Sequence, residues 1–365
     1  MQEWMWAADP GRVHTEGRMA RAALEDARAS VAALLGTRPR QVIFTSGATE
    51  AIAAATFGAA AAAGPPGGAV VLSGVEHSAV RESSAQWAAS TVDVPVDGEG
   101  RVSVAAVAEA LASTPDVRLV HCQMANHEVG TVQPVVAVAE VCREAGVMLH
   151  VDAAAAAGHI PVEFDSLGAD LMSVAAHKMG GPPGIGALLV RRGLRIPPLL
   201  VGGAQERARR AGMENVGAAV GFGAVAARLM EQTGDEDLTW MEIESVASLM
   251  RIEYLRAAVR AVPGVEIYGP TAPGARLPHV LCMGIDGVEA EPILIGLDRA
   301  GVAAHSGSSC SSEELEPSPV LQAMGVEGER SLRLSVGWST TDAEVELAAR
   351  SFGQVVEGLR RLREG

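Results

Sequence analysis

The stretch that decides the fold runs from Val147 to Lys178 and reads VMLHVDAAAAAGHIPVEFDSLGADLMSVAAHK. Two short apolar runs in it, 147–151 and 170–174, predict buried strands. The first run ends at Asp152, and the second leads into His177-Lys178. The stretch therefore predicts two strands that end beside a carboxylate and an amine.

The same pattern extends toward the N-terminus. Apolar runs at 42–45, 69–73 and 117–122 predict three more strands. Helical segments lie between the strands, among them an alanine-rich segment after Ser46-Gly-Ala-Thr-Glu50 and the segment 134–145. Near-continuous apolar strands that alternate with helices indicate an α/β fold with a mainly parallel sheet covered by helices.

Polar side chains stand at or just past the ends of these strands. In such sheets ligands bind beyond the carboxyl ends of the strands, so we expect these side chains to converge in one crevice. Taken singly, the histidines are equally consistent with ordinary loop positions, and the aspartate with a helix cap. The residues concerned are Thr49, His77, His127, Asp152 and Lys178.

Lys178 is the only lysine among the 29 basic residues of the chain. Arginine replaces lysine as a solvated surface charge, but a guanidinium does not lose its proton in proteins and cannot attack a carbonyl carbon. A single lysine in an arginine-rich chain slightly favours amine chemistry over the chance survival of one surface lysine.

The overall composition narrows the classes of function. The chain has 365 residues, 48% of them hydrophobic, and a formal net charge of −15. That length suffices for a full core and for two domains. The negative charge argues against nucleic-acid or anionic-membrane partners, which require basic surfaces.

The cysteines and the N-terminus indicate a reduced, cytoplasmic protein. Cys122, Cys142, Cys282 and Cys310 form no CxxC pair, so neither a zinc site nor a disulfide framework is expected, and no metal is predicted. The first residues lack a basic segment followed by an apolar core, so no signal peptide is expected.

Several common catalytic motifs are absent from the sequence: a phosphate loop, a dinucleotide-binding loop, a zinc-protease helix and a nucleophile elbow. The remaining residues suit pyridoxal 5′-phosphate, which needs a lysine, a carboxylate near its ring nitrogen and donors for its phosphate. Lys178 and Asp152 supply the first two. The turn 46–50 opens a helix whose N–H groups suit a phosphate, and His77 is a candidate to stack on the ring.

On these residues the chain resembles the cysteine desulfurases of the class V aminotransferase family. The matching stretches run in family order over nearly the whole sequence. They are Phe44-Thr-Ser-Gly-Ala-Thr-Glu50, Glu76-His-Ser-Ala-Val80, Asn126-His-Glu-Val-Gly-Thr-Val-Gln-Pro134, His150-Val-Asp-Ala-Ala154, His177-Lys-Met-Gly-Gly-Pro182, Gly202-Gly-Ala-Gln-Glu-Arg207, Ser306-Gly-Ser-Ser-Cys-Ser-Ser312 and Arg333-Leu-Ser-Val-Gly337.

The resemblance implies a PLP-dependent transferase fold of type I and a homodimer with active sites at the subunit interface. A polar, acidic segment from residue 231 to 245 suggests the domain boundary. We expect a large cofactor domain over residues 1–233 and a smaller α+β C-terminal domain over 234–365 that carries the Cys310 loop. The chain begins after the point where the family's first strand and its Ala-Thr-Thr turn would lie.

The resemblance also implies residue roles. Lys178 would hold the cofactor, with Asp152 at its ring nitrogen and His77 on its face, and Cys310 would receive sulfur as a persulfide. The flexible Gly/Ser loop around Cys310 suits an exposed nucleophile better than a buried structural thiol. The further roles implied are cofactor binding by Ala48, Thr49, His127 and His177 and substrate binding by Asn126 and Arg333.

The chain departs from the family pattern at several of these sites. Alanine stands at 155 and 175 where the family usually has glutamine and serine, and Met213 stands where it has a threonine that reaches the partner's phosphate. Each change removes a hydrogen bond worth roughly 0.5–1.5 kcal/mol. Together they weaken cofactor binding by roughly ten- to a thousandfold. His127 replaces an asparagine and offers an imidazole donor, and Trp338 stands where an arginine is common.

The expected reaction is the conversion of L-cysteine to L-alanine, with sulfur passed through Cys310 to an acceptor protein, for example in iron–sulfur cluster assembly. One alternative is another enzyme of the same family, a selenocysteine lyase or an aminotransferase, which would not need a persulfide. The other is a degenerate homologue that binds cofactor poorly and acts as a scaffold in sulfur transfer.

Overall fold

Seven short strands, most of them apolar, form the main sheet of the computed structural model, which describes residues 4, 6–61, 64, 67–234, 238–306 and 318–364. The strand order is β1-β7-β6-β5-β4-β2-β3, and only β7 runs antiparallel to its neighbours. The strands are β1 Val42–Thr45, β2 Ala69–Ser73, β3 Ser90–Val94, β4 Val117–His121, β5 Met148–Asp152, β6 Leu171–Ala175 and β7 Gly186–Val190. The predicted mainly parallel α/β sheet is confirmed.

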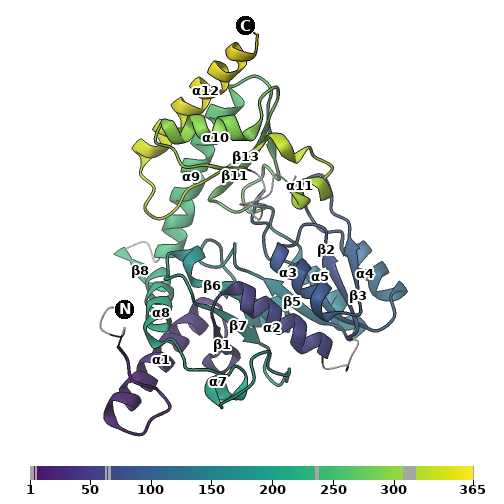
Figure 1. Cartoon of the computed structure of the whole chain (residues 1–365), viewed down its shortest axis with the longest axis vertical. Helices are drawn as coiled ribbons and strands as arrows, with labels where there is room; N and C mark the ends of the chain where they lie inside the picture. The colour runs from purple at the N-terminus through teal and green to yellow at the C-terminus, as the bar shows by residue number, and fades with distance from the viewer. Residues whose placement is uncertain are drawn as a thin grey trace. The chain divides into compact units, whose positions relative to one another are not determined.

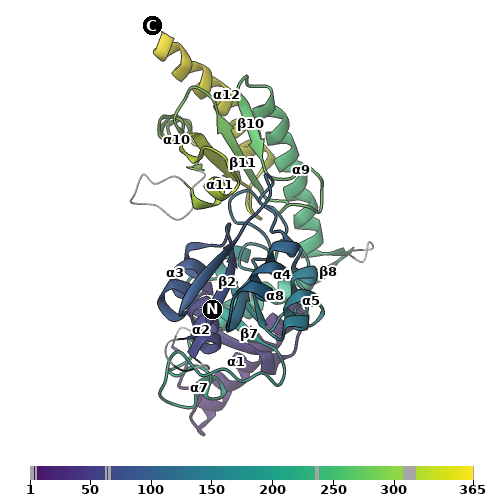
Figure 2. The same ribbon diagram turned by 90° about the vertical axis from the view of Figure 1, so that its right-hand side faces the viewer.

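Helices cover this sheet on both faces because its strands are apolar on both faces. Ile43 of β1 belongs to an apolar cluster with α2, whereas the next residue, Phe44, faces Phe222 of α8 at 6.3 Å between ring centroids. Figure 2 shows α3 and α5 on opposite sides of the strands. The helices of this part are α1 Thr15–Leu34, α2 Ala48–Ala61, α3 Ser78–Trp87, α4 Val104–Ser113, α5 Val135–Ala145, α6 Phe164–Leu167, α7 Gln205–Ala208 and α8 Val216–Met230.

Several helices begin at side chains that accept hydrogen bonds from the first turn. Ser103 caps α4 and Asn215 caps α8 through bonds from Ala106 and Ala218. The short 3-10 helices η2 (Pro39–Gln41) and η3 (Ala176–Met179) stand next to β1 and β6. A two-stranded ribbon of β8 (Gln232–Thr233) and β9 (Leu238–Thr239) precedes the long helix α9 (Trp240–Arg260).

The chain divides into two compact units. The first comprises Met1–Val94, Ser103–Met124 and Pro134–Met241, and the second comprises Pro95–Val102, Ala125–Gln133 and Glu242–Gly365. Two short segments from the first half of the sequence therefore belong with the C-terminal part, which the sequence did not indicate. The domain boundary after residue 233 stays a prediction.

The second unit is built on an antiparallel sheet in the order β10-β11-β13-β12. Figure 1 labels its two central strands, β11 and β13, beside α10. Its core joins β11 and β13 to α9, α10 and α12 through apolar side chains such as Met283, Leu332 and Phe352, each at most 1% exposed. Its elements are β10 Val265–Tyr268, β11 Val280–Ile285, α10 Ala290–Arg299, β12 His305–Ser306, α11 Pro319–Ala323, η5 Gly328–Arg330, β13 Ser331–Ser335 and α12 Asp342–Glu364.

Two negative findings apply to the ranges given above. Every helix in them is too short or too polar to cross a lipid bilayer. In the same ranges, histidine, cysteine, aspartate and glutamate side chains form no group of three or more that is arranged to hold a metal ion.

Candidate active site

The turn between β1 and α2 presents the start of a helix at the carboxyl end of the sheet. Ala48 and Thr49 are the first residues of α2, and the N–H groups of a first helical turn have no partner within the helix. The turn fits tightly against β7, because a side chain at Gly186 would come within 2.7 Å of the Gly47 backbone. The turn therefore offers donors and positive helix-dipole potential to an anion.

His77 follows β2 and begins α3. Its Nδ1 accepts a hydrogen bond from the backbone N–H of Ala79 at 3.0 Å, so the side chain caps the helix. With Nδ1 used as an acceptor, the proton of the neutral ring lies on Nε2. The cap thus fixes both the orientation of the ring and its tautomer.

Asp152 closes β5 and is buried, with 9% of the residue exposed. Its Oδ1 accepts hydrogen bonds from the Ala154 N–H and the Ser173 hydroxyl, each at 3.0 Å, and Oδ2 accepts neither of them. Burial raises the pKa of Asp152, and the nearby charges of His77 and Lys178 oppose that rise. The structure thus brings both His77 and Lys178 within electrostatic reach of Asp152.

Lys178 lies in η3, directly after β6, and its side chain is exposed. The 3-10 turn ends at Gly180, whose φ of +87° suits a residue without a side chain. His159 holds the turn from the side, with its Nε2 2.8 Å from the carbonyl oxygen of Lys178. The neighbouring His177 is exposed, and partial burial together with the charge of Lys178 lowers its pKa.

Glu76 is a buried acid beside this group that sequence reasoning did not single out. Its Oε1 accepts hydrogen bonds from the Ser73 hydroxyl at 3.0 Å and the Gln123 N–H at 2.8 Å, while the buried Oε2 has no hydrogen-bond partner in the part of the chain that the structure describes. Burial raises the pKa of Glu76 to about 7, and the charge of Asp152 adds to the effect. The only indication in the sequence that this acid is buried was its position directly after the apolar Val75.

Asn126, His127 and Arg333 belong to the second unit, so their expected approach to Lys178 stays a prediction. Asn126 is fully buried, and its Oδ1 accepts the N–H groups of Glu128 and Val129, both at 2.8 Å. Arg333, in β13, donates to the carbonyl oxygen of His127 at 3.1 Å. The structure therefore joins Arg333 to the segment that carries Asn126 and His127.

Cys310 lies outside the described residues, but residues on both sides of that segment are described. His305 pairs with Arg333 between β12 and β13. Ser318 donates a hydrogen bond to the carboxylate of Glu128, whose other oxygen lies 3.6 Å from the ring of His127. Both described flanks of the Cys310 segment thus lie near the surroundings of Arg333.

Cys122, Cys142 and Cys282 are buried free thiols. Burial raises the pKa of Cys142 and of Cys282 to about 12, and that of Cys122 well above its ordinary value. A thiol attacks as its thiolate, so these three are poor nucleophiles near neutral pH.

The positions where the chain departs from the family pattern differ in their surroundings. Ala175 is buried at the end of β6, in register with Gly186, and Ala155 is half-buried in the turn after Asp152. Met213 is 59% exposed on the loop before α8. None of these side chains has a hydrogen-bond donor, as expected from the sequence.

A mainly parallel α/β sheet that brings a lysine, a buried carboxylate and a capping histidine together defines a class of enzymes with cofactor-assisted amine chemistry. The chain belongs to the aminotransferase class-V family, whose family model matches residues 3–347. The predicted family is confirmed.

The relatives carry more specific names. The chain is 37% identical over 361 residues to "Cysteine desulfurase IscS" of Dictyoglomus turgidum, which covers 97% of this chain and 89% of that protein. It is 38% identical to "IscS-like cysteine desulfurase" of Mycobacterium tuberculosis over 96% of this chain and 89% of that one. A NifS-like protein from Rickettsia africae has a similar solved structure, with a TM-score of 0.85 and 26% identity over 98% of this chain and 94% of that chain.

Proposed function

We propose that the chain is a pyridoxal-phosphate-dependent cysteine desulfurase that converts L-cysteine to L-alanine. One observation carries the proposal: the only lysine of the sequence lies within electrostatic reach of the buried carboxylate of Asp152, which also feels the charge of His77. The names of the relatives support the same reaction.

The residues of the first unit fit the cofactor by their chemistry. Bound pyridoxal phosphate supplies an aldehyde carbon and a ring that accepts electrons. Lys178 would hold it covalently, Asp152 would face its ring nitrogen, and the first turn of α2 at Ala48 and Thr49 would bind its phosphate. His77 would cover the ring, and His177 and His127 are proposed as further contacts.

Different residues of the chain would carry out the proton transfer and the sulfur transfer. The amine of Lys178 would take the α-proton of L-cysteine, for which it must be deprotonated. Arg333 and Asn126 would bind the substrate, with the guanidinium on its carboxylate. The thiolate of Cys310 would then attack the substrate sulfur as the C–S bond breaks. The electron pair of that bond would stay with the β-carbon, which takes a proton to become the methyl group of alanine, and the sulfur would stay on Cys310 as a persulfide.

Two observations support Cys310 as the sulfur acceptor. The three described cysteines have raised thiol pKa values and are buried, so each is a poor candidate. The described flanks of the Cys310 segment lie near Arg333, the proposed substrate-binding arginine.

We propose further that the enzyme is a cytoplasmic homodimer that passes sulfur to an acceptor protein, as in iron–sulfur cluster assembly. Apolar side chains exposed on the loop before α8 favour a subunit contact, because exposed apolar patches mark interaction sites. Those side chains are Leu200, Val201 and Met213, which are 42%, 81% and 59% exposed.

One observation favours a second candidate, a scaffold that binds cofactor poorly. Ala175 is 1% exposed at the end of β6 and offers no donor where the family usually has a serine, and Ala155 and Met213 lack donors as well. This candidate predicts a protein that stays colourless when it is mixed with pyridoxal phosphate.

The experiment compares the wild type with Lys178→Arg and Cys310→Ser after reconstitution with pyridoxal phosphate. The wild type should absorb visible light, become labelled at residue 178 after borohydride and form alanine from L-cysteine. Lys178→Arg keeps the charge but cannot deprotonate, so alanine formation should fall at least about a hundredfold. Cys310→Ser should keep the visible absorption and the borohydride label but form no protein persulfide.

Alanine formation by Lys178→Arg at the wild-type rate would refute the assignment of the amine. Full alanine formation by Cys310→Ser in the presence of reductant would refute the assignment of the nucleophile and favour a persulfide-independent enzyme of the same family. A wild type without visible absorption would favour the scaffold.

A further inference from the structure

The outer edge of β1 is bonded by side chains instead of by another strand. β1 ends the sheet on one side, so alternate backbone groups from residue 40 to residue 46 point away from β7. Four of these groups have a side-chain partner, and the Val42 N–H donates to the Pro39 carbonyl instead. Arg209 donates to the Arg40 carbonyl at 2.6 Å, Arg28 donates to the Val42 carbonyl at 3.0 Å, and the N–H groups of Phe44 and Ser46 donate to Glu206 at 3.0 Å and Glu50 at 2.8 Å.

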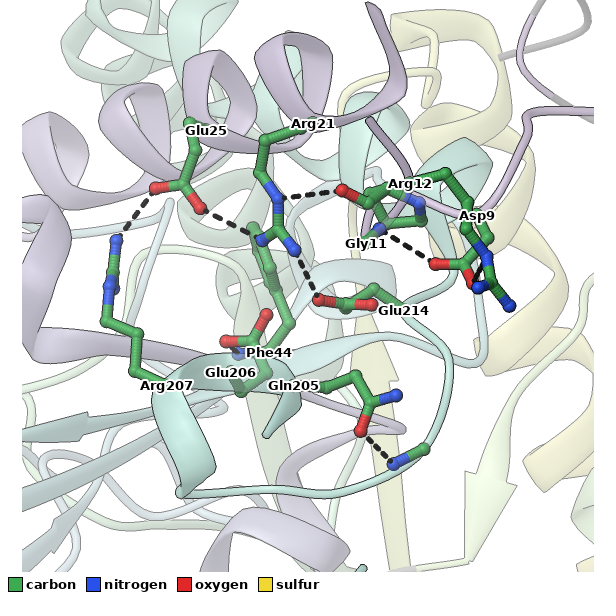
Figure 3. Close-up of polar contacts among 12 residues, drawn as sticks. Asp9, Gly11, Arg12, Arg21, Glu25, Phe44, Gln205, Glu206, Arg207 and Glu214 are labelled. Carbon is green, nitrogen blue, oxygen red and sulfur yellow. Dashed lines mark hydrogen bonds and ion pairs between the residues drawn. The ribbon is translucent and has the colours of Figure 1, made fainter. Parts of the chain in front are cut away.

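The loop that supplies two of these partners, Glu206 and Arg209, has a strained backbone and is bonded to α1 by a buried ion pair. Glu206, Arg207 and Ala208 have φ values of +47°, +59° and +60°, which side-chain-bearing residues rarely adopt. Arg28 grips the Glu206 carboxylate with two hydrogen bonds of 2.6 and 2.7 Å. Figure 3 shows Glu206 beside Phe44 and Arg207 reaching up to Glu25 of α1. The loop is thus fixed against β1.

The last contact along this edge reaches the turn that opens α2. Glu50 lies in the first turn of α2, and its Oε2 accepts the N–H of Ser46. Arg210 grips the same carboxylate through Nε at 2.9 Å and Nη2 at 3.2 Å. Burial raises the pKa of Glu50, but the bonds from Arg210 and Ser46 outweigh it and hold the pKa below its ordinary value. Glu50 therefore carries its negative charge.

A carboxylate at this position has two opposite effects. Its charge favours the positive end of the α2 dipole and closes the turn. The same charge repels any phosphate that binds to the N–H groups of Ala48 and Thr49. Arg210 cancels that repulsion while the hydrogen bond to Ser46 is kept.

We propose that Arg210 and Glu50 are positioning residues for the phosphate group of the cofactor: Glu50 shapes the turn, and Arg210 neutralises Glu50 so that the turn accepts an anion. The inference rests on the proposed function, because it takes the first turn of α2 as the phosphate site. It adds that the loop 205–210, far away in sequence, tunes that site through charge.

The test measures equilibrium binding of pyridoxal phosphate and of pyridoxal, which lacks the phosphate, to protein freed of cofactor. Arg210→Gln should weaken pyridoxal phosphate binding by about tenfold, the effect of ~1.4 kcal/mol of charge repulsion. Binding of pyridoxal should change by less than about twofold, since the repulsion acts on the phosphate. Higher salt should reduce the defect.

Further variants separate the effect of the charge at residues 50 and 210 from the effect of the side-chain shape. The double variant Glu50→Gln/Arg210→Gln should regain most of the lost affinity, because the charge that needs neutralising is gone. Arg210→Lys should stay close to the wild type, because it keeps the positive charge. Arg209→Gln is the matched control, since Arg209 bonds the Arg40 carbonyl and is expected to leave both affinities unchanged.

Three results would overturn the inference: equal losses for pyridoxal phosphate and pyridoxal, no recovery in the double variant, or a loss in Arg210→Lys as large as in Arg210→Gln. If the wild type binds pyridoxal phosphate and one of these results is found, only the inference fails. A wild type that binds neither compound overturns the proposed function, and the inference falls with it.

Discussion

Two carboxyl groups with different surroundings lie buried at the end of the parallel strands. Asp152 has the positive neighbour Lys178, and this charge and the interaction with His77 oppose the effect of its burial. Glu76 has Asp152 as a negative and Arg81 as a positive neighbour, burial has the largest effect on its pKa, and its buried Oε2 has no hydrogen-bond partner among the described residues. The two acids therefore differ in role: Asp152 is suited to carry charge, and Glu76 holds a proton up to about neutral pH.

The raised pKa of Glu76 predicts a pH-dependent stability. The carboxyl titrates near 7 when folded and near 4.5 in its ordinary state, so between these values the folded protein binds the extra proton. Stability from Glu76 is therefore complete below pH 4.5 and is lost as the pH rises through 7, at a cost of about 3 kcal/mol. Glu76→Gln, which has no charge to bury, should be more stable than the wild type at pH 8 and not at pH 4.5.

Urea unfolding of both proteins without cofactor, at pH 5, 6.5 and 8, measures this difference. Glu82→Gln is the matched control, because Glu82 is exposed on the neighbouring helix α3 and its replacement should leave the pH dependence unchanged. If the stability gain of Glu76→Gln were equal at pH 5 and pH 8, Glu76 would not be the group that titrates.

At the scale of elements, the edge of β1 depends on the buried pair Arg28–Glu206, whose side chains are 1% and 2% exposed. Breaking a buried pair leaves one charge without its partner. Glu206→Gln should therefore lower the free energy of unfolding by about 3–5 kcal/mol, because Arg28 stays charged. The double variant Arg28→Met/Glu206→Gln should lose less than the sum of its single variants, by about 1–3 kcal/mol.

A neighbouring ion pair provides the control for this prediction. Arg207 and Glu25 lie 2.8 Å apart, but their side chains are 39% and 35% exposed. Arg207→Gln should cost less than about 1 kcal/mol. Urea unfolding of the two single variants of the pair, their double variant and Arg207→Gln measures these free energies. If the loss in the double variant equalled the sum of the single losses, Arg28 and Glu206 would not stabilise the edge as a pair.

The strands differ in how accurately their bounds could be predicted from the sequence. β1 and β2 were predicted residue for residue, and β5 and β6 within one residue, because their apolar runs are bounded by turns and polar residues. β3, with the sequence STVDV, was missed because it is a largely exposed edge strand that lacks a continuous apolar run. β7 was also missed, although it is apolar, because it follows the glycine-rich turn after Lys178 and runs against its neighbours.

The candidate site was predictable where a residue follows a strand. Asp152, His77 and Lys178 were expected to converge on that ground, and their mutual electrostatic influence in the structure agrees with it. The contacts Arg28–Glu206 and Arg210–Glu50 join residues 178 and 160 positions apart, and no local pattern marks such pairs. Their roles depend on the tertiary packing of one loop against one edge.

At the scale of the whole molecule, the division into two units separates candidate site residues that lie close together in the sequence. The segment Ala125–Gln133 belongs to the second unit, where the Gly130 carbonyl accepts a hydrogen bond from Leu277 and the Val132 N–H donates to Ala275. Asn126 and His127 are therefore carried by the same unit as Arg333.

The stability of the molecule toward acid depends on a buried histidine pair between the main sheet and α2. His121 of β4 and His150 of β5 are 1% and 0% exposed, and their Nδ1 atoms lie 2.9 Å apart. A hydrogen bond between these two atoms requires one Nδ1 without a proton, so at least one of the two rings is neutral. Burial lowers the pKa of His121 to about 3 and that of His150 well below its ordinary value.

Acid should therefore unfold the protein partly through this pair. Histidines of the unfolded chain bind protons below pH 6.5, whereas the folded pair binds them only at far lower pH. Below pH 6.5 the free energy of unfolding therefore decreases by up to about 1.4 kcal/mol for each histidine and each pH unit of acidification. His121→Gln removes one such group, and its free energy of unfolding should fall less steeply than that of the wild type between pH 7 and 5. Urea unfolding of both proteins between pH 7 and pH 5 measures the two slopes. If the free energy of unfolding changed equally with pH in His121→Gln and the wild type, His121 would already bind a proton in the folded state. The description of His121 and His150 as a neutral pair would then be wrong.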